Sequence, residues 1–111
     1  MSELNDKHCV PCEGGIPPLS PERVNGLLAS LHHDWALAAD GKAIERSYKF
    51  KNYYQTIAFV NALAWIAHRE DHHPDLSVHY NRCVVRYSTH AVDGLTDNDF
   101  ICAAKVDRLV V

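Results

Sequence analysis

The segment from Ile57 to Ala67 constrains the fold more than any other part of the chain. Asn61 is the only polar residue within it. The run is too short to span a bilayer, and a helix that is apolar on nearly every side must be covered on more than one side. We therefore expect a long helix from Tyr53 to about Glu70. One side should pack on a sheet, and the other on a second helix or another subunit.

Two predicted strand pairs flank this helix and supply the sheet. The strands are expected over residues 35–37 and 43–50, and over residues 76–81 and 83–89. Asp40-Gly41 joins the first pair and is a strong hairpin turn signal. The second pair alternates apolar and polar residues, as half-buried strands do. Arg46 interrupts the apolar side of its strand, which predicts a place at the sheet edge or a stem lying over apolar surface.

Two further helices complete the predicted order α-β-β-α-β-β-α. Ser20-Pro21-Glu22 has the features of a helix start, and Thr96 and Asp99 have the spacing of a capping box. This order indicates an α+β fold, a single four-stranded antiparallel sheet with helices packed on one face. A length of 111 residues corresponds to one domain, which we place at residues 20–111. Residues 1–19 are expected to form a flexible N-terminal tail.

Charge and cysteine content narrow the class of protein. Eleven Lys and Arg against fourteen Asp and Glu give a formal net charge of −3, which argues against nucleic-acid binding. Residues 1–10 lack the apolar core of a signal peptide, so a cytoplasmic protein with reduced thiols and no membrane contact is expected. Cys9-Val10-Pro11-Cys12 is one Cys-x-x-Cys, and a structural zinc site needs two further ligands. Exposed thiols are the first interpretation, with metal or redox roles left open.

Histidines carry the strongest functional signal, because five of the eight lie between residues 68 and 90. Pro74 predicts a helix end at about His73, since the residue before a proline avoids the α region. His72 and His73 would then lie at a helix end, and His90 would follow a strand. These two ends can meet at one edge of a sheet. Imidazoles titrate near neutral pH, so such a cluster suits general acid–base chemistry.

Other motifs are incomplete. His68 and His72 have the spacing of metal ligands on a helix, but Arg69 stands where the zincin motif requires Glu. Gly14-Gly15 lacks the lysine and the strand–helix setting of a phosphate-binding loop. From the residues alone, helix-terminal histidines without chemistry and an Asp99 that only caps a helix remain open.

The spacing of these residues resembles the pterin-4a-carbinolamine dehydratase family. The family pattern is a polar residue, a His-His-Pro, an aromatic residue, a His and an Asp at fixed intervals. The corresponding residues here are His68, His72-His73-Pro74, Tyr80, His90 and Asp99. The resemblance covers about residues 19–109 and includes Trp35 before the first hairpin. It implies the same α+β fold.

The resemblance implies dehydration of 4a-hydroxytetrahydropterin to the quinonoid dihydropterin, which recycles the cofactor of aromatic amino-acid hydroxylases. The 4a-hydroxyl has to be protonated as its C–O bond breaks, and the N5 proton has to leave. One acid and one base suffice, so no metal and no cofactor is expected. His72 and His90 are expected to exchange protons with the 4a-hydroxyl, one on each side of the pterin. His73 would hold the pterin or accept the N5 proton.

Further roles follow from the resemblance as expectations. Asp71 and Asp99 would orient imidazoles, Trp35 would form a pocket wall, and backbone groups would bind the pterin. The expected substrate-binding residues are Trp35, Asp71, Pro74, Thr89, Ala91, Val92 and Asp99. The expected partners are the pterin, further copies in a homodimer or homotetramer, and an aromatic amino-acid hydroxylase. The alternatives are a non-catalytic dimerisation or interaction protein of the same fold and a metal-binding module that uses His68, His72 and the N-terminal cysteines.

Overall fold

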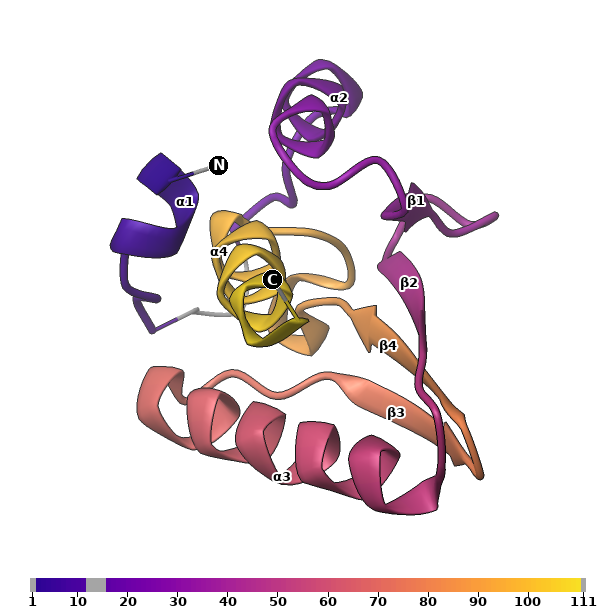
Figure 1. Ribbon diagram of the computed structural model, residues 1–111. Helices are drawn as coiled ribbons and strands as arrows, with labels where there is room; N and C mark the ends of the chain where they lie inside the picture. Colours follow the sequence, from indigo (N-terminus) through magenta and orange to yellow (C-terminus); the bar gives the residue numbers. More distant parts are fainter. Residues whose placement is uncertain (1, 12–15, 111) are drawn as a thin grey trace.

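An antiparallel sheet of four strands in the order β1-β2-β4-β3 forms one layer of the computed structural model, which describes residues 2–11 and 16–110 (Figure 1). The strands are β1 (Ala36–Leu37), β2 (Ile44–Lys49), β3 (Asp75–His79) and β4 (Arg82–Tyr87). Each predicted pair is a hairpin, and the two hairpins join where β2 pairs with β4. The predicted four-stranded antiparallel sheet is confirmed.

Helices form the second layer, on one face of the sheet. They are α1 (Ser2–Asp6), α2 (Pro21–Ala29), α3 (Tyr53–Glu70) and α4 (Asp97–Asp107), with short 3-10 turns η1 (His90–Val92) and η2 (Arg108–Val110). Figure 1 shows α3 and α4 on the same side of the sheet and α1 on the outer side of α4. The α+β class is therefore confirmed. None of the helices in the described ranges combines the length and the apolar character needed to cross a membrane.

The helix boundaries follow from local capping. The Ser20 side chain accepts a hydrogen bond from the Arg23 amide at 3.2 Å, and Asn52 caps α3 in the same way. Helix α3 spans the predicted range from Tyr53 to about Glu70, but its stop signal differs from the predicted one. The helix ends at Glu70 because Asp71 adopts the left-handed conformation, with φ of 51°, and not because of Pro74. Aspartate is one of the few residues that tolerate this conformation.

The core lies between the inner face of the sheet and the helices. Alternate residues of β4, namely Cys83, Val85 and Tyr87, have no exposed surface. Helix α4 lies at the centre, with nine of its eleven residues buried. Helix α3 buries Phe59 and Leu63 but leaves Trp65 61% exposed. Within this chain, the apolar helix is therefore covered on one side only.

A buried polar cluster explains the unexpected Arg46 in β2. Strand β1 pairs only with Ile44 and Glu45 of β2, so Arg46 lies where the outer side of β2 is no longer paired, in line with the predicted place at the sheet edge. Its guanidinium lies over the Tyr48 ring, 4.4 Å from the centroid, and its Nη1 is 2.7 Å from the Asp107 carboxylate. The Trp35 indole and the Tyr48 hydroxyl donate to the same carboxylate. This cluster ties β2 and the start of β1 to the end of α4.

Residues 2–11 differ from the expected flexible tail. Within the described residues 2–11, Leu4 is 5% exposed in the core, and Lys105 of α4 donates to the Asn5 carbonyl at 2.7 Å. The prediction needs correction here, because a five-residue helix is too short for its apolar spacing to be visible in the sequence. Cys12, Gly14 and Gly15 lie outside the described residues.

Candidate active site

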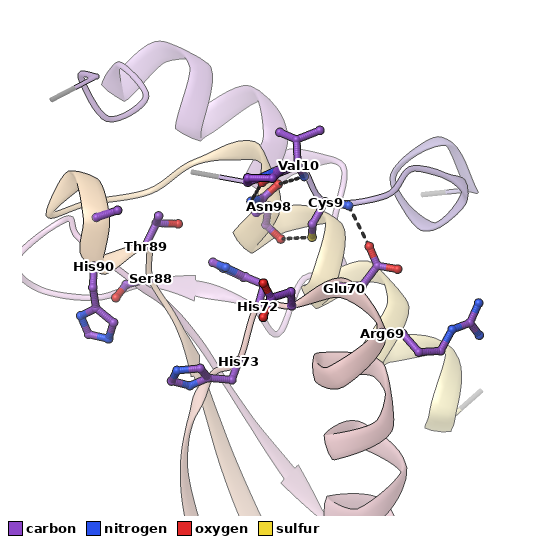
Figure 2. Close-up of a pocket in the computed structure, with 13 residues that line it drawn as sticks. Cys9, Val10, Arg69, Glu70, His72, His73, Ser88, Thr89, His90 and Asn98 are labelled. Atoms are coloured by element: carbon purple, nitrogen blue, oxygen red, sulfur yellow. Dashed lines mark hydrogen bonds between the residues drawn. The ribbon is translucent and has the colours of Figure 1, made fainter. Parts of the chain in front are cut away.

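A cavity of about 500 Å³ opens where the ends of α3 and β4 meet the start of α4 (Figure 2). Its size falls within the usual range for small-molecule sites. It is lined by Cys9, Val10, Pro11, Arg69, Glu70, Asp71, His72, His73, Ser88, Thr89, His90, Ala91 and Asn98. All three predicted catalytic histidines thus lie on its walls.

The turn after α3 directs two of these histidines. The Asp71 amide donates to the His68 carbonyl and the His72 amide to the Ala67 carbonyl, at 3.3 and 3.1 Å. These bonds close the helix end while the left-handed Asp71 redirects the chain. His72 and His73 therefore leave the helix axis and face the cavity, before β3 begins at Asp75.

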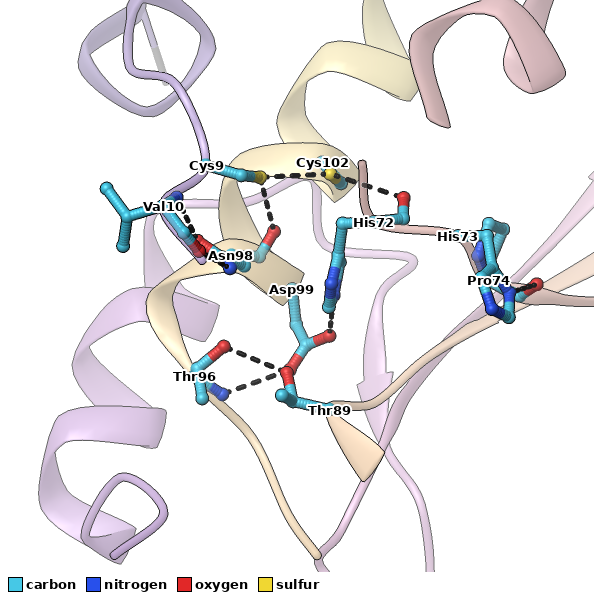
Figure 3. A network of polar contacts seen from close by, with 10 residues as sticks. All are labelled: Cys9, Val10, His72, His73, Pro74, Thr89, Thr96, Asn98, Asp99 and Cys102. Atoms are coloured by element: carbon cyan, nitrogen blue, oxygen red, sulfur yellow. Dashed lines mark hydrogen bonds and ion pairs between the residues drawn. The ribbon is translucent and has the colours of Figure 1, made fainter. Parts of the chain in front are cut away.

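His72 is held by a fully buried carboxylate (Figure 3). Its Nε2 lies 2.6 Å from Asp99 Oδ1, and its ring stacks on Tyr87 with centroids 5.7 Å apart. Asp99 Oδ2 accepts from the Thr89 hydroxyl and the Thr96 amide at 2.8 and 3.0 Å. A neutral imidazole that donates its Nε2 proton to a carboxylate keeps Nδ1 as a proton acceptor. The pair fixes both the orientation and the tautomer of His72.

His73 and His90 are exposed and reach the cavity from two different elements. His73 follows α3, and its Nδ1 lies 3.3 Å from the Pro74 carbonyl. His90 opens η1 directly after β4. Figure 2 shows His72 and His73 on one side of the cavity and His90 on the other. The arrangement places one constrained imidazole and two unconstrained ones around the same space.

Asp99 makes both of the contacts that the sequence left open as alternatives, one that caps a helix and one with an imidazole. Its Oδ2 completes the capping box with Thr96, and its Oδ1 binds His72. Thr89, another predicted site residue, lines the cavity and donates to the same carboxylate. Asp71 also lines the cavity, but within residues 2–11 and 16–110 its carboxylate contacts no imidazole. Its predicted orienting role therefore belongs to Asp99 alone.

Four predicted substrate-binding residues do not line the cavity: Asp99 lies fully buried behind His72, and three others lie elsewhere. Trp35 is 3% exposed in the core, because its indole N–H finds a buried acceptor in Asp107 at 3.0 Å. It does not form the predicted pocket wall. Val92 is buried in η1, away from the cavity lining. Pro74 lines a neighbouring groove between α3 and β3, whereas Ala91 lies on the cavity wall as predicted.

The N-terminal segment supplies a wall that the sequence did not reveal. Asn98 holds Val10 in both directions: its Oδ1 accepts from the Val10 amide at 3.1 Å, and its Nδ2 donates to the Val10 carbonyl at 2.6 Å. Glu70 accepts from the Cys9 amide at 2.7 Å and lies 3.1 Å from His8. No motif marks these residues, since each contact joins positions more than sixty residues apart.

The Glu70 contacts also set its charge. Burial acts to raise the pKa of this carboxyl, but the hydrogen bonds from the Cys9 amide and His8 outweigh burial, with help from Lys105. The pKa of Glu70 therefore lies below its ordinary value. The carboxylate form is the one that holds the N-terminal segment.

The predicted metal-binding alternative finds no support in the described residues. The close group of possible ligands within residues 2–11 and 16–110 is His32, His33 and Asp34, none of which lines the cavity. His72 instead donates to Asp99, and the N-terminal Cys12 lies outside the described ranges.

Comparison with known proteins places this architecture in a family. The model of the pterin 4 alpha carbinolamine dehydratase family matches residues 17–109. A Nitrosomonas europaea protein, provisionally named pterin-4-alpha-carbinolamine dehydratase, is 61% identical over 98% of this chain and 95% of its own length. A provisionally so named Legionella pneumophila protein is 54% identical over 99% of this chain and 97% of its own length. The chain belongs to the pterin-4a-carbinolamine dehydratase family.

Two solved structures share the fold. One, described as a transcriptional coactivator/pterin dehydratase from Brucella melitensis, has a TM-score of 0.81 and 32% identity, covering 85% of this chain and 99% of its own. The other is described as a pterin dehydratase-like RuBisCO assembly factor of the alpha-carboxysome. It has a TM-score of 0.61 and 24% identity, covering 70% of this chain and 90% of its own, and so supports the fold alone.

Proposed function

We propose that this cavity binds a 4a-hydroxytetrahydropterin and catalyses its dehydration to the quinonoid dihydropterin. The observation that carries the proposal is the Asp99-bound His72 on one wall of a cavity whose other wall carries His90. Family membership supports the same substrate class.

The proposed reaction needs two proton transfers. A protonated His90 donates to the 4a-hydroxyl, which leaves as water while the N5 lone pair forms the new C=N bond. A base on the opposite wall accepts the N5 proton. His72 offers an unprotonated Nδ1 because Asp99 holds its Nε2 proton, and His73 holds the pterin beside it. This assignment of roles to the histidines is narrower than the one expected from the sequence, in which both His72 and His90 exchange protons with the hydroxyl.

The expected gain is consistent with simple acid–base catalysis. Each positioned proton transfer contributes roughly 10²–10⁴-fold to the rate. Asp99 adds to this by supporting the imidazolium that forms when His72 accepts a proton. The predicted recycling of a hydroxylase cofactor, the hydroxylase partner, the cytoplasmic location and the homodimer or homotetramer stay predictions. The exposed Trp65 on α3 is consistent with a subunit contact.

The direct test measures dehydration of freshly generated 4a-hydroxytetrahydropterin by ultraviolet absorbance, with and without the protein. We expect a clear acceleration that His72→Ala and His90→Ala each reduce by about 10²-fold or more. His79→Ala is the matched control, because His79 is an exposed histidine on β3 whose Nε2 contacts the Ser77 hydroxyl and which lies outside the cavity.

Two results would count against the proposal. Folded wild-type protein without any acceleration would favour the alternative of a non-catalytic interaction protein. An acceleration that survives both cavity substitutions would assign the chemistry to other residues.

A further inference from the structure

Two cysteines from opposite ends of the chain meet beside the cavity. The Sγ atoms of Cys9 and Cys102 lie 3.4 Å apart, although 93 positions separate the residues in sequence (Figure 3). Cys102 is fully buried on α4, and Cys9 is partly exposed in the N-terminal segment. The sequence offered Cys9 only as a partner of Cys12, so this pairing is a product of the fold.

The surrounding contacts hold the two thiols in place. The Cys9 amide is bonded to Glu70, and the Cys9 Sγ lies 3.7 Å from the Asn98 carbonyl, one helical turn before Cys102. Asn98 also clamps the neighbouring Val10 in both directions. A disulfide has an S–S distance of about 2.0 Å, so the sulfurs need to approach by only about 1.4 Å. The N-terminal segment, which lies at the surface, would make this approach, and not the buried α4.

We propose that Cys9 and Cys102 form a reversible disulfide that fixes the N-terminal segment as a wall of the cavity. The oxidant is a low-molecular-weight disulfide. The Cys9 thiolate attacks it, forming a mixed disulfide and releasing one thiol. The Cys102 thiolate then attacks Cys9 Sγ and releases the second thiol. Two protein thiols and one disulfide thus become one protein disulfide and two small thiols. Cys9 reacts first because Cys102 has no exposed surface.

Formation of this disulfide would change a contact of His72 in the candidate catalytic centre. In the reduced protein the Cys102 thiol lies 3.9 Å from the His72 carbonyl as a donor, and oxidation removes that S–H group. The bond would also lock Cys9, Val10 and Pro11 against the space they line. The family model begins matching at residue 17, so this wall is added to the domain that defines the family. The inference therefore goes beyond the proposed dehydratase activity and does not depend on it.

The thiol surroundings set the conditions of the test. The hydrogen bond with Cys102, burial and the nearby Glu70 carboxylate all raise the pKa of Cys9. Oxidation at neutral pH should therefore be slow, since the thiolate is the reacting form. The experiment should be run at about pH 8.5, where more thiolate is present.

Full-length protein is equilibrated with oxidised and reduced glutathione, quenched with acid, alkylated and digested with trypsin without reduction. The expected product links the peptide of residues 8–23 to that of residues 87–105, with a mass loss of two hydrogens. Free thiols in denaturant fall from four to two. The same link is expected in Cys12→Ala and is lost in Cys9→Ala. The Val10 amide should also exchange its hydrogen more slowly after oxidation.

Two outcomes would overturn the inference. One is a disulfide between Cys9 and Cys12, which would remain inside the peptide of residues 8–23. The other is an unmodified Cys102 in Cys12→Ala protein under buffers that fully oxidise dithiothreitol. Each readout is independent of pterin turnover, so failure here is distinguishable from failure of the proposed function.

Discussion

Replacing Asp99 with asparagine tests whether the tautomer of His72 matters. The substitution keeps the shape of the side chain but leaves one oxygen to serve two sets of donors. On one side stand the Thr89 hydroxyl and the Thr96 amide, and on the other stands His72 Nε2 at 2.6 Å. An amide oxygen that faces the two threonines turns its NH₂ toward His72. The imidazole must then move its proton to Nδ1 and loses its acceptor on the cavity side.

The magnitudes follow from these contacts. A wrongly protonated base forfeits most of one proton-transfer contribution, so we expect kcat to fall by about 10²–10⁴-fold. If the asparagine side chain is turned the other way, its NH₂ group faces the Thr96 amide instead of an oxygen. The helix cap is then weakened, which costs about 0.5–2 kcal/mol. The loss of the charge-assisted bond to His72 adds about 1–3 kcal/mol to the destabilisation. The fold should survive, because the buried apolar contacts of α4 are unchanged.

The assay combines dehydration rates, urea unfolding and nitrogen NMR of the His72 ring. Asp97→Asn is the matched control, because Asp97 lies in the same helical turn, is half exposed and forms an exposed ion pair with Arg23 at 3.8 Å. The control should change stability by less than about 0.5 kcal/mol and leave the tautomer alone. A folded Asp99→Asn protein that retains the wild-type rate and the wild-type His72 tautomer would refute the reasoning.

Three further predictions address the fold and the N-terminal segment. Gly94→Ala should destabilise the protein by about 1–3 kcal/mol in urea unfolding, because its Cβ would lie 2.7 Å from Pro18. Gly26→Ala, with open space around it on α2, should be neutral or stabilise by up to about 1 kcal/mol, and equal effects at both glycines would contradict the packing argument. Asp107→Ala should cost about 3–5 kcal/mol, because it strands the partly buried Arg46 charge, and a loss below about 1 kcal/mol would show that the cluster contributes little. The NMR shift of the Cys9 amide should titrate with Glu70 at a midpoint below the ordinary glutamate pKa of about 4.3. The contact is then complete above a pH of about 4.3 and is lost as the pH falls through the lowered pKa of Glu70. A midpoint at or above about 4.3 would contradict this prediction.

Most of the fold could be predicted because its signals are local. The apolar run in α3, the Asp40-Gly41 turn and the capping residues Ser20 and Thr96 each act within a few positions. The order of elements from α2 to α4 and the α+β class followed from them. The range of α3 was predicted, but Pro74 was given as a stop signal, whereas the helix ends because Asp71 adopts a left-handed backbone, which no pattern of side chains announces.

The site could be predicted only where its residues lie at the ends of helices and strands that the sequence reveals. Histidines 72, 73 and 90 were found because a helix end and a strand end frame them, and the family resemblance supplied Asp99. Trp35 was misassigned, since its partner Asp107 lies 72 positions away. The wall formed by Cys9 and Val10 was missed for the same reason: it depends on contacts between the two ends of the chain.

The central position of α4 has a consequence for protein synthesis. This helix provides the middle of the core, the carboxylate behind His72 and the anchor of the N-terminal segment, yet it is synthesised after the sheet and after helices α1 to α3. A nascent chain that ends before Asp97 therefore lacks the middle of the core and the carboxylate that holds His72. Truncated products of this chain should be recognised as unfolded and degraded instead of accumulating as stable, partly folded proteins.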